Sequence, residues 1–369
     1  MKKNIFTLLL GVTIVSIFTA CNSDFRRRAG GSIEEIIVVM DSSMWNSETA
    51  KAIRETYGRN IMTLPNPVPF YQLSFTDFYT NKQLENLKSL RNVIIAAPID
   101  EQSNTGELVR SSLPQENEDK VRSGESFAFP VKDQWYKDQY VIILTSTSDD
   151  ELASKIRNSE RSIISDVFER ELLRWEEDVY DRLEQTQYSD SLWDAYGWKV
   201  RIQHDYIKNI DTLNFVTFRR SLIDNDRWMW AWWQDDVDNI SFLDNNWINA
   251  KRDSLLETWI RGTREDSYTT TDYKHHPVET QTFNLDNLFV HETQGVWTMT
   301  NDAMAGPFVN FTYYDPDTRR LFMVEYGQFA PVVRNKRRYV KQFRAMGRTF
   351  ESDSLYNQRK ANKEAISSL

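Results

Sequence analysis

The sequence is poor in the residues on which several common functional sites depend. Its 369 residues include one Cys, four His, 12 Gly and 10 Pro. A single cysteine excludes an intramolecular disulfide, so the fold must be stabilised by its hydrophobic core. Neither a G-x-x-x-x-G-K-[ST] nor a G-x-G-x-x-G motif is present, which argues against a glycine-rich phosphate loop. We therefore expect no cofactor.

The few histidines do not form a complete metal-binding motif. His291 and Glu292 begin an H-E-x-x-H pattern, but Gly295 stands where the second histidine is needed. His275 and His276 are adjacent, and adjacent side chains of an extended segment point to opposite faces. We expect this pair in an exposed loop, and we expect no metal site.

Residues 1–20 have the pattern of a secretory signal peptide. Lys2 and Lys3 precede an apolar stretch over 5–18, shorter than the ~20 residues that a spanning helix needs. The junction with Cys21 resembles a bacterial lipoprotein signal, in which the cysteine becomes the lipidated first residue. The alternative is an unmodified thiol. We expect Cys21 to carry fatty acids such as palmitate and to anchor a cell-envelope protein, at the periplasmic face of the outer membrane.

The composition along the chain suggests five segments. These are the signal peptide over 1–20, a flexible tether over 21–31, an N-terminal half over 32–188, a C-terminal half over 189–350 and a polar tail over 351–369. Arg26, Arg27 and Arg28 in the tether could contact anionic lipid headgroups, or they could belong to a merely solvated linker.

The N-terminal half reads as strands alternating with helices. Apolar runs predict buried strands over 35–40, 91–97 and 140–144, and helices over 45–57 and 149–185, the second with a break near Asn158 and Ser159. Asp41 follows the first strand and is interpreted as a helix cap, with half of a D-x-S-x-S metal motif as the alternative. The polar stretch over 101–126 is predicted to be a long mobile loop.

The C-terminal half carries more strand candidates. We expect strands over 198–203, 215–219 and 228–233, a hairpin of 308–314 with 321–326, a loop over 263–282, and helices over 247–260 and 334–346. These elements predict an α+β fold, mainly antiparallel sheets packed with amphipathic helices. The similar order of elements suggests two similar α+β halves.

The densest aromatic feature is the segment from Trp228 to Trp233. In a strand, Trp228, Trp230 and Trp232 share one face, which would make an aromatic platform for sugar rings or another flat ligand. The alternating residues are apolar too, so a strand buried on both faces is the preferred interpretation.

Seven basic residues and no acid fall within residues 334–348. In an exported, acidic chain this pattern does not indicate nucleic acid. The preferred interpretation is a solvated helix face that balances the acidic body. Contact with an anionic lipid or another anionic envelope polymer is the alternative.

A segment that includes Trp297, Asp302, Gly306 and Pro307 resembles a known family signature. Residues 295–308 (GVWTMTNDAMAGPF) are similar to the G-[LVI]-W…D-x-M-G-G-P-F pattern of domain-of-unknown-function family 4837, a lipoprotein family of Bacteroidota. The segments 36–45, 64–70 and 91–94 are similar to its other recurrent segments, so the resemblance covers almost all of the mature chain. Ala305 stands where the family has Gly. The resemblance implies an exported, anchored protein and no known activity.

Small residues at 303–307 suggest a structural turn, with a ligand loop formed by Trp297, Asp302, Gly306 and Pro307 as the alternative. We expect a lipid-anchored envelope protein with a binding or scaffolding role, not an enzyme, whose partner is an envelope glycan, an anionic lipid or a protein. One alternative is a glycan hydrolase that uses carboxylates, which requires a second acid near Asp302 in a cleft. A subunit of an envelope assembly is another, and it predicts an exposed apolar patch.

Overall fold

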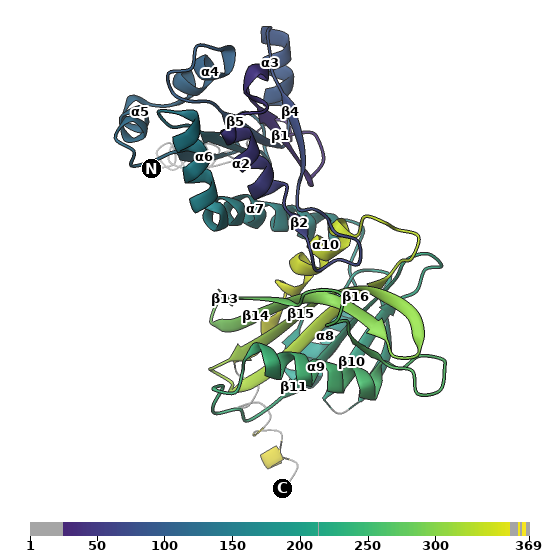
Figure 1. Cartoon of the computed structure of the whole chain (residues 1–369). Helices are drawn as coiled ribbons and strands as arrows, with labels where there is room; N and C mark the ends of the chain where they lie inside the picture. The colour runs from purple at the N-terminus through teal and green to yellow at the C-terminus, as the bar shows by residue number, and fades with distance from the viewer. Residues whose placement is uncertain (1–24, 213, 355–360, 362–363, 367–369) are drawn as a thin grey trace, which may run out of the picture.

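The chain folds into two lobes that meet along helices α7 (Glu160–Tyr180) and α10 (Arg337–Gly347) (Figure 1). The computed structural model describes residues 25–212, 214–354, 361 and 364–366. The predicted signal peptide and Cys21 lie outside the described residues.

The N-terminal lobe is built on a five-stranded sheet in the order β4-β1-β5-β7-β6. The strands are β1 (Glu35–Val39), β4 (Gln72–Thr76), β5 (Asn92–Ala96), β6 (Ala128–Lys132) and β7 (Tyr140–Leu144). β4, β1, β5 and β7 are parallel, and only β6 runs antiparallel to its neighbour. Every residue of β5 and β7 is buried, as expected for parallel strands covered on both faces.

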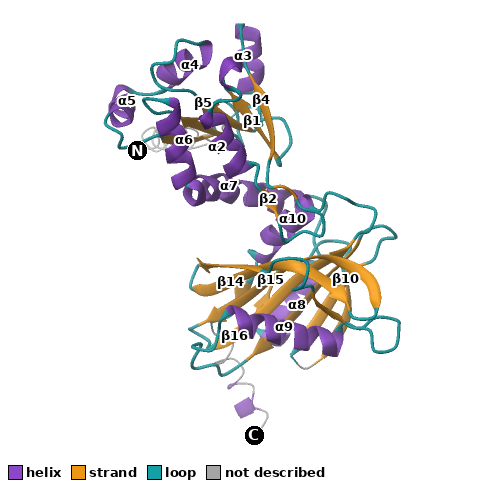
Figure 2. Cartoon of the chain, viewed as in Figure 1, coloured by secondary structure: helices purple, strands orange, loops and turns teal. Residues whose placement is uncertain are grey.

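Helices cover both faces of this sheet (Figure 2). One face packs against α2 (Glu48–Tyr57), α6 (Asp149–Asn158) and α7, and the other against α3 (Asn81–Lys88), α4 (Asn104–Ser112) and α5 (Gln115–Arg122). The predicted break is confirmed, because Ser159 separates α6 from α7. Asp41 is indeed a cap, since its carboxylate accepts from the Ser43 backbone N–H at the start of the short 3-10 helix η1 (Ser42–Met44).

The prediction of a long mobile loop over 101–126 is wrong, because α4 and α5 occupy most of it. Ser103 caps α4 by accepting from the Gly106 backbone N–H at 3.0 Å. Val121 is the only buried residue of α5. With one anchor in eight residues, the helical repeat of apolar positions is not visible in the sequence.

The C-terminal lobe is built on an antiparallel sheet in the order β12-β14-β15-β16-β11-β10-β9, with β13 also pairing with β14. Its strands are β9 (Ile207–Thr212), β10 (Phe215–Arg220), β11 (Asp226–Gln234), β12 (Thr269–Thr271), β13 (Glu279–Leu285), β14 (Leu288–Met299), β15 (Asp302–Asp315) and β16 (Arg320–Phe329). The predicted hairpin is confirmed as β15 and β16. The predicted loop over 263–282 instead contains β12 and the start of β13.

Alternate residues of this sheet enter two different cores. Phe215, Trp230 and Trp232 pack against α9 (Asn245–Trp259) on one face. Val216, Phe218 and other residues of the opposite face pack against α10 and α8 (Thr186–Tyr196). Two small sheets complete the fold: β2 (Asn60–Ile61) with β3 (Val68–Pro69), and β8 (Trp198–Lys199) with β17 (Glu351–Ser352). Of the strand predicted over 198–203, only residues 198 and 199 form a strand, β8.

The predicted α+β class, with mostly antiparallel sheets, is confirmed. The similarity between the halves does not extend to strand direction, since the first large sheet is mostly parallel and the second is antiparallel. The expected boundary at 188–189 falls inside α8. The expected polar tail also begins with ordered contacts, because Ser352 donates to the Asp315 carboxylate at 2.5 Å.

The basic helix α10 lies between the two lobes. Lys341 donates to both carboxylate oxygens of Glu171 on α7, and Arg344 and Arg348 both donate to Glu292 on β14. Lys341, Arg344, Glu171 and Glu292 are all buried. The preferred interpretation of 334–348 as a solvated helix face is therefore wrong, because most of its cations, among them Lys341 and Arg344, are buried.

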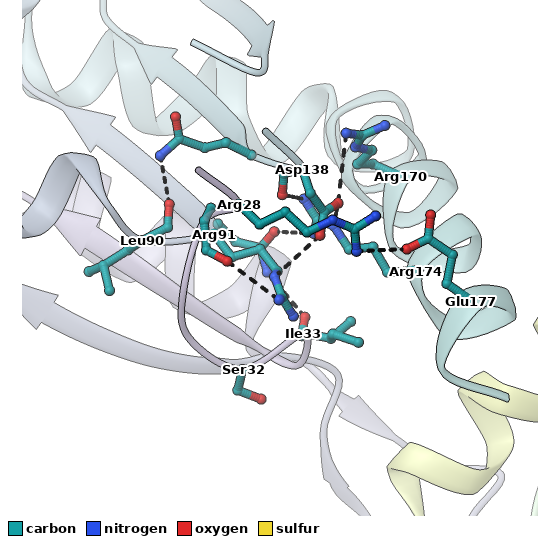
Figure 3. Close-up of polar contacts among 12 residues, drawn as sticks. Arg28, Ser32, Ile33, Leu90, Arg91, Asp138, Arg170, Arg174 and Glu177 are labelled. Atoms are coloured by element: carbon teal, nitrogen blue, oxygen red, sulfur yellow. Dashed lines mark hydrogen bonds and ion pairs between the residues drawn. The ribbon is translucent and has the colours of Figure 1, made fainter. Parts of the chain in front are cut away.

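The part of the expected tether nearest the lobe is docked on it (Figure 3). The Ala29 backbone N–H donates to Lys137 O at 2.9 Å, and the Gly30 N–H donates to Ser89 O at 2.9 Å. Arg28 donates to Glu177 on α7 at 3.1 Å. Residues 27–30 are thus part of the fold and not a flexible linker.

Candidate functional site

Two hairpin ends meet at one end of the C-terminal sheet. β10 ends at Arg220 and β11 begins at Asp226, while β14 ends at Met299 and β15 begins at Asp302. The end of β16 lies between them, because Phe329 pairs with Asp226. The candidate site is the pocket enclosed between these hairpins and the last turn of α9.

Trp228 and Trp297 form the aromatic wall of the pocket. Their rings meet edge to face with centroids 5.1 Å apart, a favourable geometry for two aromatic rings. The Trp297 indole N–H donates to Gln328 O at 3.2 Å, which fixes the orientation of the ring. Trp297 is buried and Trp228 is half-buried, so Trp228 is the part of the wall that solvent reaches.

Two glycines make room for these indoles. A Cβ on Gly327 would lie 2.5 Å from Cε2 of Trp228, and a Cβ on Gly306 would lie 2.8 Å from Nε1 of Trp297 and 1.9 Å from Gln328 O. Only a residue without a side chain allows the rings to approach the neighbouring strands this closely. The small residues therefore serve to place the aromatic wall.

The pocket has a volume of about 280 Å³. Its lining is mainly apolar, with polar groups from the strand ends and from the loop after α9. The lining residues are Asn209, Ile210, Thr217, Phe218, Arg219, Asp226, Trp228, Trp259, Ile260, Arg261, Gly262, Thr263, Thr269, Trp297, Met299, Asp302, Met304 and Phe329. An apolar cleft with a few convergent polar groups is the usual form of a small-molecule site.

Both carboxylates in the pocket are paired with arginine. Arg219 Nε lies 3.1 Å from each carboxylate oxygen of Asp226, and this hydrogen bonding raises the pKa of Arg219. Asp302 lies 3.7 Å from Arg264 Nε and accepts from the Ala303 backbone N–H at 2.8 Å. Each carboxylate thus lies beside a cation of the same chain, and together they supply charged groups at the strand ends of the pocket.

The structure divides the expected aromatic platform. Trp228 lines the pocket, whereas Trp230 and Trp232 are buried against Ile248, Leu255 and other residues of α9. The burial of these two side chains fits the preferred interpretation of a strand buried on both faces. It leaves Trp228 alone available to a ligand.

Residues 302–307 form the start of a strand and not a turn. Trp297 pairs with Gly306, and the chain reverses earlier, between Met299 and Asp302. Ala305 has no positive φ and pairs with Thr298, so alanine is not strained there. Trp297 and Asp302 of the expected ligand loop line the pocket, while Gly306 and Pro307 are buried outside the lining.

Sequence reasoning missed half of the pocket. Arg219, Asp226 and Phe329 lie at strand ends, and Trp259 lies at the end of α9. No motif marks any of them. Only the pairing of β10, β11 and β16 brings the first three together.

The histidines lie elsewhere. The two carboxylate oxygens of Asp272 contact Nδ1 of His275 and Nδ1 of His276, each at 2.9 Å, so a turn brings both rings to one side. Burial raises the pKa of Asp272, but the histidine hydrogen bonds outweigh it and lower the pKa. His291 is buried on β14.

The described residues lack two further features. No group of three or more His, Cys, Asp and Glu is arranged to hold a metal ion. No helix among them combines the length and the apolar character needed to cross a membrane.

The chain is thus a two-lobed α+β protein with an aromatic-walled pocket in its C-terminal lobe, and two family models each match a part of it. Residues 185–349 match "Domain of unknown function (DUF4837)" and residues 29–180 match "Domain of unknown function (DUF8532)". The resemblance recognised at 295–308 is thus supported for the C-terminal lobe. It does not extend to the N-terminal segments, which fall in the second model.

Solved structures show distant similarity. The Saccharomyces cerevisiae Ran-binding protein Mog1p is 10% identical over 43% of this chain and 92% of that chain, with a TM-score of 0.28. A protein from Bacteroides thetaiotaomicron VPI-5482 is 6% identical over 42% of this chain and 45% of that chain, with a TM-score of 0.23. No curated protein sequence matches the chain.

Proposed function

We propose that this chain is a lipid-anchored protein of the cell envelope that binds a ring-sized ligand, such as one sugar unit of an envelope glycan, in the pocket lined by Trp228 and Trp297. The carrying observation is the pocket itself: an aromatic wall beside Asp302 and the Arg219–Asp226 pair. An indole face packs against the apolar face of a sugar ring, and the paired charges offer donors and acceptors to its hydroxyls.

The binding experiment uses the chain from residue 22 and isothermal titration with methyl glycosides and soluble peptidoglycan fragments. Trp228→Ala and Asp302→Asn are expected to weaken binding at least tenfold. Trp193→Ala is the matched control, because Trp193 is also half-buried but lies on α8, away from the pocket. Equal affinities for wild type and Trp228→Ala would exclude the pocket as the binding site.

The anchor is supported by the lipoprotein-like signal that ends at Cys21. Two or more acyl chains hold a protein at a membrane where one does not. Labelling of cells with an alkyne fatty acid is expected to tag the wild-type chain and not Cys21→Ser. Recovery of the label on Cys21→Ser would refute lipidation at this residue.

A second candidate is the carboxylate-dependent hydrolase. The observation that favours it is that Asp302 shares its pocket with a second acid, Asp226. A hydrolase would release reducing ends from the same glycan fragments, and Asp302→Asn would abolish this release. Binding without release of reducing ends decides in favour of the binding protein.

A further inference from the structure

Three exposed aliphatic side chains lie at the same end of the C-terminal sheet as the pocket. Ile207 begins β9, and Leu222 and Ile223 form the connection between β10 and β11. Their exposed fractions are 67%, 48% and 102%. A single exposed aliphatic residue is ordinary. Three at one end of a sheet, next to an apolar pocket, suggest that this surface contacts another molecule.

The strand register places Ile207 next to the pocket lining. Ile207 pairs with Arg219, and Arg219 pairs with Trp228, so all three side chains stand on the same face of the sheet. Arg219 also pairs with Asp226, the first residue after the β10–β11 connection. Ile207 therefore extends this face of the sheet beyond Arg219, and Leu222 and Ile223 lie in the connection between the strands that carry the pocket-lining Arg219 and Asp226.

We propose that the ligand is an amphiphile, a ring-sized polar headgroup that carries an alkyl chain. This inference rests on the proposed function. The headgroup occupies the pocket against Trp228 and Trp297, and the chain leaves past Arg219 to lie along Ile207, Leu222 and Ile223. The chemical class is a glycolipid or another sugar-linked lipid.

The size of the aliphatic surface favours an alkyl chain over a protein partner. A specific protein interface buries at least roughly 1,200 Å² in total. Three aliphatic side chains at a hairpin end provide far less than one side of such an interface. A single alkyl chain needs only a narrow apolar strip, and it gains about 0.8 kcal/mol, or about fourfold in affinity, for each buried methylene.

The test uses the chain from residue 22 with methyl, butyl, hexyl and octyl β-D-glucoside below their critical micelle concentrations. Affinity is expected to rise by about fourfold for each methylene that contacts the protein. Leu222→Ser combined with Ile223→Ser is expected to reduce the octyl affinity to near the methyl value. Both side chains are exposed, so the double variant keeps the folded core intact.

The matched control is Leu173→Ser. Leu173 is 57% exposed but lies on α7 of the other lobe. Its replacement is expected to leave the dependence on chain length as in the wild type. An equal loss in both variants would mean general detergent binding and would overturn the inference.

The remaining outcomes separate this inference from the proposed function. If Trp228→Ala weakens binding but affinity is independent of chain length, the pocket holds a ring and the amphiphile is excluded. If Trp228→Ala has no effect, or if no glucoside binds, the proposed function and the inference fail together. If the double variant changes the sedimentation coefficient from dimer to monomer, the hairpin end is a contact between copies and the inference is wrong.

Discussion

Lys341 on α10 and Glu171 on α7 form a buried ion pair between the two lobes, with Nζ 2.8 Å from Oε1 and 3.0 Å from Oε2. The same carboxylate accepts from the Tyr71 hydroxyl at 2.6 Å and from the Trp175 indole N–H at 2.8 Å. Each carboxylate oxygen of Glu171 thus accepts from two donors. A buried charge satisfied in this way is stable only while its partner remains.

We expect Lys341→Met to lower the free energy of unfolding by about 3–5 kcal/mol, because it removes the only cation among the described residues that is hydrogen-bonded to the buried Glu171 carboxylate. Urea unfolding followed by circular dichroism measures the change. Adding Glu171→Gln is expected to recover part of the loss, since the amide oxygen still accepts from Tyr71. Lys120→Met is the control: its pair with Glu116 is largely exposed, so a loss above about 1 kcal/mol there would contradict the argument.

The buried His291 makes stability depend on pH. Neither ring nitrogen has a hydrogen-bond partner within the described residues, and burial lowers the pKa of this imidazole below its usual 6.5. Below pH 6.5 the unfolded chain therefore binds a proton that the folded chain does not. The free energy of unfolding consequently decreases as the pH is lowered. Relative to wild type, His291→Phe is expected to gain stability as pH decreases from 6.5, by at most about 1.4 kcal/mol per pH unit. A difference that is constant from pH 7.5 to 5 would refute this role.

Gly327→Ala tests the placement of the pocket wall. Its Cβ would lie 2.5 Å from the Trp228 ring, so the indole must move. We expect a loss of about 1–3 kcal/mol in stability and weaker ligand binding. Gly30→Ala serves as the comparison, because the nearest atom to its Cβ is 3.9 Å away and its stability should be near that of wild type. Unchanged binding by Gly327→Ala would show that Trp228 does not contact the ligand.

Truncation tests the docked N-terminal segment. Backbone hydrogen bonds join Arg27, Ala29 and Gly30 to residues 89–91 and 137. A chain that begins at residue 32 is expected to be about 2 kcal/mol less stable than one that begins at residue 25. Faster limited proteolysis of the shorter chain would support the expectation, and equal rates for the two chains would argue that these bonds add nothing.

The strands of the N-terminal lobe could be found from the sequence, but their order could not. Apolar runs such as Val93–Ile95 mark a strand buried on both faces, whereas the parallel pairing of β1 with β4 and β5 depends on contacts between distant segments. α5 was missed because Val121 is its single buried residue. Local patterns identify an element only when enough of its side chains are anchored.

Only some of the pocket residues could be predicted from the sequence, for the same reason. Trp228 and Trp297 stood out because of their residue type, but Trp259 and the Arg219–Asp226 pair enter through the pairing of strands and the position of α9. The basic run was misjudged because its acidic partners, Glu171 and Glu292, lie on elements far away in the chain. Charge balance is a property of the packed structure and not of a segment.

The cations of α10 pair with Glu171 of the N-terminal lobe and with Glu292 of the C-terminal lobe. Rotation of one lobe against the other would therefore leave buried charged groups without their partners and without water. Buried ion pairs therefore oppose rotation of one lobe against the other. A molecule held in the pocket of the C-terminal lobe is then coupled to the N-terminal lobe, where residues 27–30 are docked, through these buried ion pairs.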